Sequence, residues 1–577
     1  MSYFLPTSPD EVAKLGWKQL DIIIVTGDAY VDHPSFGPVL IARFLLSKGY
    51  KVGIISQPDW QSDTDFLSLG TPRLFFGISS GNMDSMINHY TAQRKIRSTD
   101  AYSPDGKMGL RPNRATIVYS QKIRSLYKDV PIVLGGVEAS LRRLPHYDFW
   151  SDKIRNSILF DSRADILVYG MGEKPILEVV EKLDQGMPVS EIQTVQGTVV
   201  SSRSDSGEIN LGEYKSEMTK NQFWKFQKEF IKNHLTKKIS YQFSGKYLIH
   251  NIPAKPLSGQ EMDEVYNLPF QRKPHPKYGK KTIPAFVQIQ NSITSHRGCF
   301  GGCNFCSIGL HQGKTIQSRS EHSILHEIRK MSESDDFNGT VSDIGGPSAN
   351  MYAMFCKLGI SQKCPRRSCL YPEICEHLET SHKAYKKLLQ RAERLENVKH
   401  VFVSSGIRFD LALQDTDFIK KIAESHVQGL LKLAPEHKSK KVLHLMNKPS
   451  FELYERFGKF FGTYSQQIGK KQYIVPYIII GHPGADFSDT IELAIYLKRN
   501  NIKLKQVQEF TPTPMTESTL MYFTEKDLNG NSIHVPKGRE IRLMKSLILW
   551  YEKENRKYII EALKLNHRED LIDFFLK

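Results

Sequence analysis

The sequence predicts an α/β protein made of a doubly wound, Rossmann-like sheet, a partial (β/α)6 barrel and a helical C-terminal tail. Short β-branched runs ending in glycine alternate with helical patterns up to about residue 190. Six further strand–helix units follow in the second half of the chain, and only helical patterns come after them. We therefore expect four regions: an N-terminal α/β domain at 1–195, an irregular α+β linker at 196–283, the barrel at 284–520 and a helical extension at 521–577.

Composition and charge indicate a soluble globular protein. The chain has 577 residues, 40% hydrophobic and 24% charged, enough for two or three domains. Apolar runs such as 22–25 and 478–480 are strand-sized and too short to cross a bilayer. The N-terminus lacks a secretory pattern, and seven clustered cysteines fit a reducing compartment. We expect a cytoplasmic protein with no membrane contact.

The N-terminal half begins with a buried parallel strand at 22–25, followed by a helix at 38–46 and a second strand at 49–55. Strand, helix and strand imply a right-handed crossover in a parallel sheet. Further strands are expected at 74–77, 115–119, 132–136 and 166–170. Ligands of such sheets bind at the carboxyl ends of the strands, which here carry Gly27, Asp28, Gly135 and Gly136.

The middle region is polar and mixed, with a helix expected at 223–234 and one or two strands at 239–249. A strap at 272–281 carries five Lys or Arg residues, two prolines and a glycine, so no regular element is expected there. The formal charge of +17 permits nucleic-acid binding. Sparse aromatic residues in the strap and lysines spread along the chain favour a solvated linker and surface instead.

The barrel pattern starts with a strand expected at 285–292 and an amphipathic helix at 320–331. Six parallel units make an incomplete β/α barrel, with chemistry at the carboxyl ends of the strands and an open side for a large substrate. The later strands are expected at 340–344, 400–404, 429–433, 473–480 and 506–510. The remaining helices are expected at 384–395, 416–424, 451–464 and 488–499, with tail helices at 541–551 and 557–565.

Three cysteines, Cys299, Cys303 and Cys306, follow the first barrel strand in a glycine-bearing loop. Clustered thiolates are soft ligands that favour an iron–sulfur cluster or zinc. A [4Fe–4S] cluster normally takes four thiolates, so three leave one iron with an open position, as in a catalytic metal centre. Gly301 and Gly302 let the loop turn tightly around such a group.

The pattern Cys-x-x-x-Cys-x-aromatic-Cys resembles the signature of the radical SAM enzymes. The resemblance implies that the three cysteines hold a [4Fe–4S] cluster whose open iron chelates the amino and carboxylate groups of S-adenosylmethionine (SAM). It implies that Phe305 lies against the adenine. It also implies reductive cleavage of SAM to methionine and a 5′-deoxyadenosyl radical, which abstracts a hydrogen atom from the substrate.

Two strand ends carry further candidate cofactor residues. The resemblance implies that Gly345 and Gly346, after the second strand, offer backbone groups to the SAM amino group. Ser404 and Arg408, after the third strand, match positions that bind the ribose or the carboxylate. A planar guanidinium suits a carboxylate bidentately.

The fourth and fifth strand ends add Glu436 and the turn from Gly481 through His482 and Pro483. Glu436 is a candidate for a ribose hydroxyl or the substrate, and the turn resembles one that flanks adenine in the same superfamily. An ordinary tight turn after a strand is an equally good interpretation for Glu436 and His482.

A second cysteine group lies between the second and third barrel strands. Four thiolates in a basic, proline-containing loop could hold an auxiliary iron–sulfur cluster or a tetrahedral zinc ion. Reduced surface thiols are the alternative, since the spacing is looser than a Cys-x-x-Cys pair. The group comprises Cys356, Cys364, Cys369 and Cys375.

Together, the strap, the first cysteine loop, the turn at 343–352 and the second cysteine group resemble the YgiQ-type radical SAM proteins. The run at 133–140 resembles the cobalamin-binding-type domain that precedes many radical SAM cores. Domains of that type with a lower histidine ligand carry Asp-x-His-x-x-Gly, whereas Asp32 and His33 are adjacent here. Cobalamin is therefore not predicted.

The sequence thus predicts a radical SAM enzyme of unknown substrate, served by a reducing donor such as flavodoxin or ferredoxin. One alternative is an RNA-modifying radical SAM enzyme, which the positive charge would suit and which salt-dependent tRNA binding would support. The other alternative is a non-catalytic, metal-stabilised binding module, in which case adding SAM would have no effect on the protein.

Overall fold

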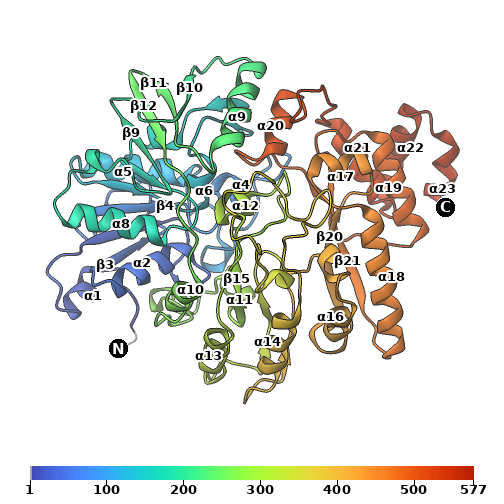
Figure 1. The fold of residues 1–577 in the computed structure, drawn as a ribbon, viewed down its shortest axis with the longest axis horizontal. Helices are drawn as coiled ribbons and strands as arrows, with labels where there is room; N and C mark the ends of the chain where they lie inside the picture. Colours follow the sequence, from blue (N-terminus) through green and yellow to red (C-terminus); the bar gives the residue numbers. More distant parts are fainter. Residues whose placement is uncertain (1–2) are drawn as a thin grey trace.

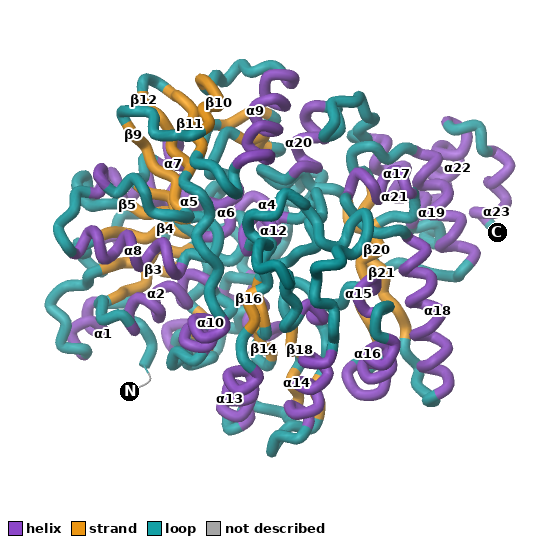
Figure 2. The backbone as a smooth tube through the Cα atoms, in the orientation of Figure 1, coloured by secondary structure: helices purple, strands orange, loops and turns teal. Residues whose placement is uncertain are grey.

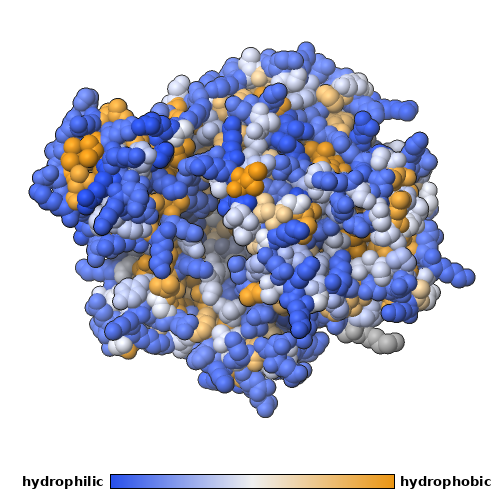
Figure 3. Space-filling model, turned by 180° about the vertical axis from the view of Figure 1, so that it is seen from behind, coloured by the Kyte–Doolittle hydropathy of each residue, from blue (hydrophilic) through white to orange (hydrophobic). Residues whose placement is uncertain are grey.

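Two α/β regions and a helical C-terminal region lie next to one another in the computed structural model, which describes residues 3–577 (Figure 1). The N-terminal sheet occupies one end of the molecule, and the C-terminal helices occupy the other. The face in Figure 3 is mostly hydrophilic, with apolar side chains in small groups. Within the described part of the chain, every helix is too short or too polar to cross a membrane.

The N-terminal sheet has a parallel half that contains five of the six strands predicted for the N-terminal domain. Its order from the edge is β3 (Val52–Ser56), β1 (Ile22–Thr26), β4 (Phe75–Ser79), β5 (Ile132–Leu134) and β8 (Ile166–Val168). Alternate residues of β1 face opposite sides of the sheet, so both faces need cover. Ile22 and Ile24 enter one core with α2 (Gly37–Ser47) and α8 (Glu173–Asp184), whereas Ile23 and Val25 enter a second core with α5 (Ala115–Leu126).

The strand expected at 115–119 is wrong, because these residues begin helix α5. Thr116, Tyr119, Ser120 and Ile123 are buried at the three- and four-residue spacing of one helix face. The β-branched and aromatic residues at 116–119 favour a strand locally, and packing against the sheet outweighs that preference.

The sheet does not end near residue 195, which corrects the linker expected at 196–283. Strand β9 (Thr198–Ser202) pairs antiparallel with β8, and three more strands extend the sheet to nine. These are β12 (Lys246–His250), β11 (Ile239–Phe243) and β10 (Ile209–Glu213). The helix expected at 223–234 is α9 (Lys220–Asn233), which covers this extension with Phe223, Phe226 and Phe230.

The basic strap is an ordered connection, and the expectation of no regular element in it is wrong, because it contains a two-residue strand and a short 3₁₀ helix at Pro276–Tyr278. β13 (Lys273–Pro274) pairs antiparallel with β2 (Val31–Asp32). His275 stacks on Tyr30 with ring centroids 5.2 Å apart, and Arg272 forms an ion pair with Glu327 in the central region. The strap therefore contacts both the N-terminal region, through β2 and Tyr30, and the central region, through Glu327.

The central region contains two groups of parallel strands in chain order. In the first group, β14 (Ser292–Thr294) pairs with β18 (Asp343–Gly345), and β17 (Thr340–Val341) pairs with β19 (His400–Val401). In the second group, β21 (Tyr473–Ile480) lies between β20 (Leu430–Glu436) and β22 (Gln508–Glu509). The helices that pack on these strands are α13 (Glu321–Ser332), α14 (Lys383–Glu393), α16 (Thr416–Lys421), α18 (Phe451–Gln467) and α19 (Phe487–Arg499).

The strand expected at 285–292 is also wrong, because most of it is helix α11 (Pro284–Ile289). Pro284 stands in the first turn, where its fixed φ suits a helix and its missing N–H costs nothing. Only Ser292–Thr294 remain as the strand that leads toward the cysteines.

The C-terminal region connects the two ends of the molecule. Helices α21 (Arg539–Ile548) and α22 (Arg556–Leu565) share a core with α19. Helix α20 (Glu517–Thr524) lies beside α9 of the N-terminal region (Figure 2). Phe523 stacks on Tyr147 with centroids 4.5 Å apart, and the Trp224 indole N–H donates to the Asp527 carbonyl at 3.0 Å.

Candidate functional site

Cys299, Cys303 and Cys306 lie in one loop between β15 (His296–Arg297) and α12 (Ser307–Gln312). The Cys306 amide donates to the Cys303 carbonyl at 3.1 Å, and Cys306 is the N-cap residue of α12. The Cys299 amide donates to the Gly313 carbonyl, also at 3.1 Å, just beyond the other end of that helix. One six-residue helix therefore holds the first and last cysteines in place.

Close neighbours on two sides explain the glycines of this loop. Gly302 has φ +61°, and a Cβ there would lie 2.6 Å from the Arg367 carbonyl oxygen. A Cβ on Gly301 would lie 3.1 Å from Arg408 Nη1 and 3.3 Å from Cys299 Sγ. Larger residues at 301 and 302 would push away the arginine and the segment that cover the thiols.

Two asparagines that the sequence analysis missed anchor the loop to α17 (Lys440–Met446). The Asn304 side-chain amide donates to the Leu445 carbonyl at 2.8 Å, and the Asn447 amide donates to the Gly302 carbonyl at 2.5 Å. The Asn304 carbonyl accepts from the Ser518 amide of α20 at 3.0 Å. Since the partners are more than 140 residues away in sequence, no local pattern indicates these contacts.

Arg408 is the cation nearest to the cysteines among the polar contacts of the described residues. Its Nη1 lies 3.8 Å from Cys303 Sγ, and its side chain is almost fully buried. Asp410 accepts from Arg408 Nε at 2.9 Å and from Nη2 at 2.5 Å. Asp410, two residues after Arg408, thus aims the remaining guanidinium edge at the thiols.

The thiols lie in an environment that disfavours free thiolates. Burial and the neighbouring Cys303 and Cys299 raise the pKa of Cys306 to about 12. Burial and Cys303 also raise the pKa of Cys299, while Arg408 and Lys448 oppose that rise. A positively charged metal group is what would favour three adjacent thiolates here.

Glu436 lies in the same charged neighbourhood. It is buried with φ +67°, and its Oε1 is 3.7 Å from Lys448 Nζ. Burial raises the pKa of Glu436, and Lys448 and Arg408 oppose the rise. Lys448 also donates to the Ala434 carbonyl at 2.7 Å. The structure therefore brings Glu436, Arg408 and the cysteines together, with Lys448 as a residue that sequence reasoning missed.

Gly345, Gly346 and Ser404 lie at the ends of neighbouring parallel strands. A Cβ on Gly345 would lie 2.0 Å from Ser405 Oγ, and one on Gly346 would lie 2.7 Å from the His296 ring. The exposed Ser404 donates its hydroxyl to the Ser342 carbonyl at 2.7 Å. Glycines suit positions 345 and 346 because a Cβ at either would collide with its neighbours. The Ser404 hydroxyl is already used in a hydrogen bond between two strand ends.

Phe305 and the turn at Gly481–Pro483, both predicted on the adenine side, lie next to one another. The Phe305 ring is edge-on to His482, with centroids 6.3 Å apart. His482 is fully buried, and its Nε2 is 2.7 Å from Ser518 Oγ in α20. Burial lowers the pKa of His482 to about 3, so its imidazole is neutral and has a structural hydrogen bond.

The second cysteine group packs directly on the first loop. The Cys369 amide donates to the Phe300 carbonyl at 3.0 Å, and Ser368 Oγ donates to the Gly301 carbonyl at 2.7 Å. The Cys375 amide donates to the Cys369 carbonyl at 2.8 Å. Cys369, Phe300 and Leu411 share a small apolar core with Cys299 and Cys375 at its edge.

Neither cysteine group has the geometry of a single-ion site. Among residues 3–577, no group of three or more His, Cys, Asp or Glu side chains converges on one point that could hold a metal ion. The three thiolates of a cubane bind three different irons, so they lie further apart than the ligands of one ion. The donor set of the first loop, three soft sulfurs beside a buried arginine, fits such a cluster.

The switch point of the N-terminal sheet is filled by protein. Arg111 is fully buried between Asp28 and Asp100, with nitrogen–oxygen distances of 3.1 Å to each. A Cβ on Gly27 would lie 3.1 Å from the Arg111 side chain. The crevice between β1 and β4, where such sheets usually bind ligands, thus holds a buried ion-pair network.

Two family models match this sequence. The one described as "Radical SAM N-terminal" matches residues 4–292, half of the chain, and a domain of unknown function (DUF3362) matches residues 505–576. Relatives match over nearly the full length. The UPF0313 protein GSU2873 of Geobacter sulfurreducens is 47% identical, covering 98% of this chain and 96% of that protein. The UPF0313 protein YgiQ of Escherichia coli is 43% identical, covering 99% and 87%.

Among solved structures, a radical SAM methyltransferase, TsrM, from Kitasatospora setae matches 86% of this chain and 75% of its own chain. The TM-score is 0.48 and the sequence identity is 13%, a likeness too distant to assign a fold or an activity.

Proposed function

This chain belongs to the UPF0313 family, which includes YgiQ, and on that premise we propose that it is a radical SAM enzyme. Cys299, Cys303 and Cys306 would hold a [4Fe–4S] cluster in a partial (β/α)6 barrel formed by the central strands. When bound, the cluster supplies one electron to SAM, whose cleavage yields methionine and a 5′-deoxyadenosyl radical for hydrogen abstraction. A flavodoxin or ferredoxin is the proposed donor.

One observation carries this proposal: three cysteines at the required spacing share one loop, with a buried arginine 3.8 Å from the middle sulfur. Arg408 balances negative charge at the thiolates, and Asp410 fixes its orientation. Asn304 and Asn447 hold the loop against α17, and α20 covers it from outside. These residues position the thiols, which are partly exposed.

The proposal is tested by product analysis. Anaerobically reconstituted and chemically reduced protein should convert SAM to methionine and 5′-deoxyadenosine, detected by liquid chromatography with mass spectrometry. Protein that holds four irons per chain yet forms neither product would refute the proposal.

We propose that Arg408 also contributes to SAM binding. Replacing the buried pair together, Arg408→Gln with Asp410→Asn, avoids leaving one charge unpaired. A lost charge-assisted hydrogen bond costs about 1.5–3 kcal/mol, so SAM affinity should fall roughly ten- to a hundredfold. Calorimetric titration of SAM and the iron content are measured together. If SAM affinity falls while the iron content stays full, Arg408 contacts SAM. If iron is lost, Arg408 acts on the cluster only. If both the affinity and the iron content are unchanged, Arg408 is not part of the site.

We propose that Cys356, Cys364, Cys369 and Cys375 hold a second metal group, an auxiliary iron–sulfur cluster in preference to zinc, because in the described part of the chain these thiols do not converge on one point as the ligands of a single ion do. Replacing Cys299, Cys303 and Cys306 together by alanine should then leave protein that still binds metal. Residual iron with a charge-transfer absorbance would identify a cluster, and colourless zinc a structural site. A metal-free triple variant, shown by elemental mass spectrometry after anaerobic reconstitution, would mean that the four cysteines are only thiols in a loop.

A further inference from the structure

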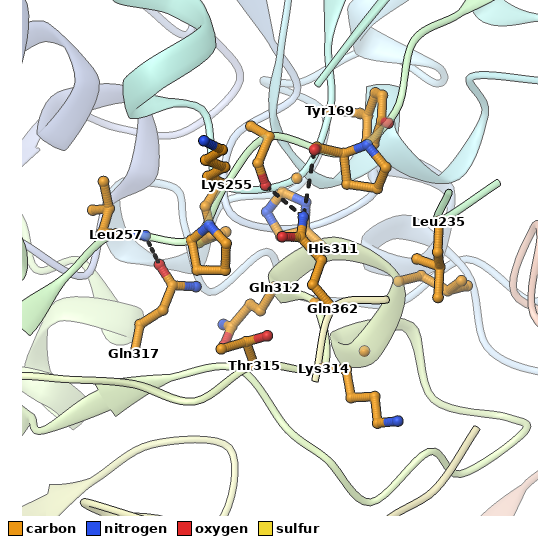
Figure 4. A pocket seen from close by; sticks show the side chains of 18 of the residues that line it. Tyr169, Leu235, Lys255, Leu257, His311, Gln312, Lys314, Thr315, Gln317 and Gln362 are labelled. Carbon is orange, nitrogen blue, oxygen red and sulfur yellow. Dashed lines mark hydrogen bonds between the residues drawn. The ribbon is translucent and has the colours of Figure 1, made fainter. Parts of the chain in front are cut away.

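A cavity lies between the N-terminal sheet and the segment that follows the cysteine loop (Figure 4). Its volume is about 120 Å³, close to that of a cavity able to hold a benzene-sized molecule. The walls come from the carboxyl end of β8, the segment after β12 and the end of α12. In Figure 4, His311 lies centrally, with Lys255 on one side and Leu235 on the other.

The lining of this cavity is cationic and contains no carboxylate. Four of its residues are Arg143, Lys174, Lys255 and Lys314, and none is Asp or Glu. Two carboxylates lie close by, and each has its own cation. Glu261 is 2.9 Å from Lys174 Nζ, and Glu173 is 2.5 Å from the buried Arg297. Among residues 3–577, no carboxylate forms an ion pair with Arg143, Lys255 or Lys314, and the Lys314 ammonium donates instead to the Arg366 carbonyl.

Arg143 is the key member of this lining, because it is only 2% exposed. Its Nε donates to His250 Nε2 at 3.1 Å, and its Nη1 donates to the Ser140 carbonyl at 2.5 Å. Its guanidinium lies over the Tyr169 ring, 4.7 Å from the centroid. No carboxylate among residues 3–577 lies within ion-pair distance of it. Buried charges in proteins are normally paired, so this arginine lacks its expected partner.

The histidines around Arg143 do not add or remove charge near neutral pH. Burial, with Arg143 as a second cause, lowers the pKa of His234 and of His311 to about 4, and that of His250 well below its usual value. All three are neutral at pH 7. They act as hydrogen-bonding walls, and His311 Nδ1 lies 3.0 Å from Ser140 Oγ.

The cavity borders the cysteine loop directly. Gln312 and Gly313 line it, and both contact the residues that start the loop. Gln312 Oε1 accepts from the Gly298 amide at 3.0 Å, and the Gly313 carbonyl accepts from the Cys299 amide at 3.1 Å. Only the short helix α12 and the backbone at the start of the cysteine loop would therefore separate a ligand in this cavity from the thiols.

We propose that this cavity binds the oxyanion group of a small molecule, a phosphoryl or carboxylate group, with Arg143 as its buried counter-charge and Lys255 and Lys314 at its edge. The volume suits such a group and a few attached atoms. That this molecule is the substrate rests on the proposed function, whereas oxyanion binding does not. The test below therefore needs neither SAM nor a reduced cluster.

The test titrates the full-length protein with inorganic phosphate or acetate at fixed ionic strength, followed by ligand-observed NMR. We expect saturable binding of at least one of them, and the tighter of the two identifies the group. Arg143→Met and Lys255→Met should each weaken it at least tenfold. Lys246→Met is the matched control, because it removes an exposed charge on β12 outside the cavity and should bind as the wild type does.

Arg143→Met could fail to fold, so Arg143→Lys and Lys255→Met decide the matter in that case. Arg143→Lys keeps the charge but loses the planar fork, and we expect intermediate affinity. Absence of saturation by both anions in wild-type protein would overturn the proposal. Equal weakening by Lys246→Met and Lys255→Met would overturn it too, since that would be unspecific attraction to a basic surface.

Discussion

Cys303→Ala should abolish formation of 5′-deoxyadenosine from SAM. Cys303 is the middle cysteine of the loop and the one whose sulfur Arg408 faces at 3.8 Å. Two remaining thiolates cannot replace the three that the proposed cluster needs, so activity should fall below detection. The measurement is chromatographic quantification of 5′-deoxyadenosine after anaerobic reconstitution and reduction.

Cys364→Ala is the matched control for this prediction. It makes the same chemical change in the second cysteine group and leaves the loop at 299–306 intact. We expect SAM cleavage to persist in this variant. Product formation by Cys303→Ala at the wild-type level would remove the first loop from the chemistry.

The second large effect is expected from Asp410→Ala. This change leaves the buried Arg408 guanidinium without the carboxylate that accepts two of its hydrogen bonds. Removing one partner of a buried pair typically costs about 3–5 kcal/mol. Because a chain of this size need not unfold in one step, the local opening free energy is the useful quantity. Hydrogen exchange in peptides covering α15 (Phe409–Ala412) measures it.

Asp410→Asn is the control, since it keeps a hydrogen-bond acceptor while removing the charge. We expect a smaller increase in exchange for Asp410→Asn than for Asp410→Ala. Identical exchange in the wild type and both variants would show that Asp410 does not hold Arg408 in place.

Much of the fold could be predicted because its signals are local. The β-branched runs at Ile22–Thr26 and Tyr473–Ile480 end in glycine-containing turns and form parallel strands, the first fully buried and the second buried toward its carboxyl end. In the antiparallel extension, the strands expected at 239–249 are present, whereas Thr198–Ser202 and Ile209–Glu213 were missed. The outermost of these, Ile209–Glu213, is largely exposed and polar. Helix α5 was misread because the residues at 116–119 favour a strand until the rest of the protein is present.

The candidate site likewise contains residues that a local sequence pattern indicates and residues that only the folded structure identifies. The cysteine spacing is a local signal, and the structure places the three thiols in one loop. Asn304 and Asn447 could not be identified from sequence, because their partners lie more than 140 residues away. Lys448 could not be identified either, because its contacts with Glu436 and Ala434 depend on how the turn after β20 folds. Arg143 gave no signal either, since its significance is that, in the described part of the chain, no carboxylate pairs with it, which only the assembled structure reveals.

Electron paramagnetic resonance of the reduced, reconstituted protein tests the central claim most directly. The account predicts a [4Fe–4S] signal from the cluster at Cys299, Cys303 and Cys306, and a change in that signal when SAM is added, because SAM would occupy the open iron. Cys303→Ala should lose the signal that responds to SAM. A cluster whose signal is identical with and without SAM, or no cluster at these cysteines, would contradict the account.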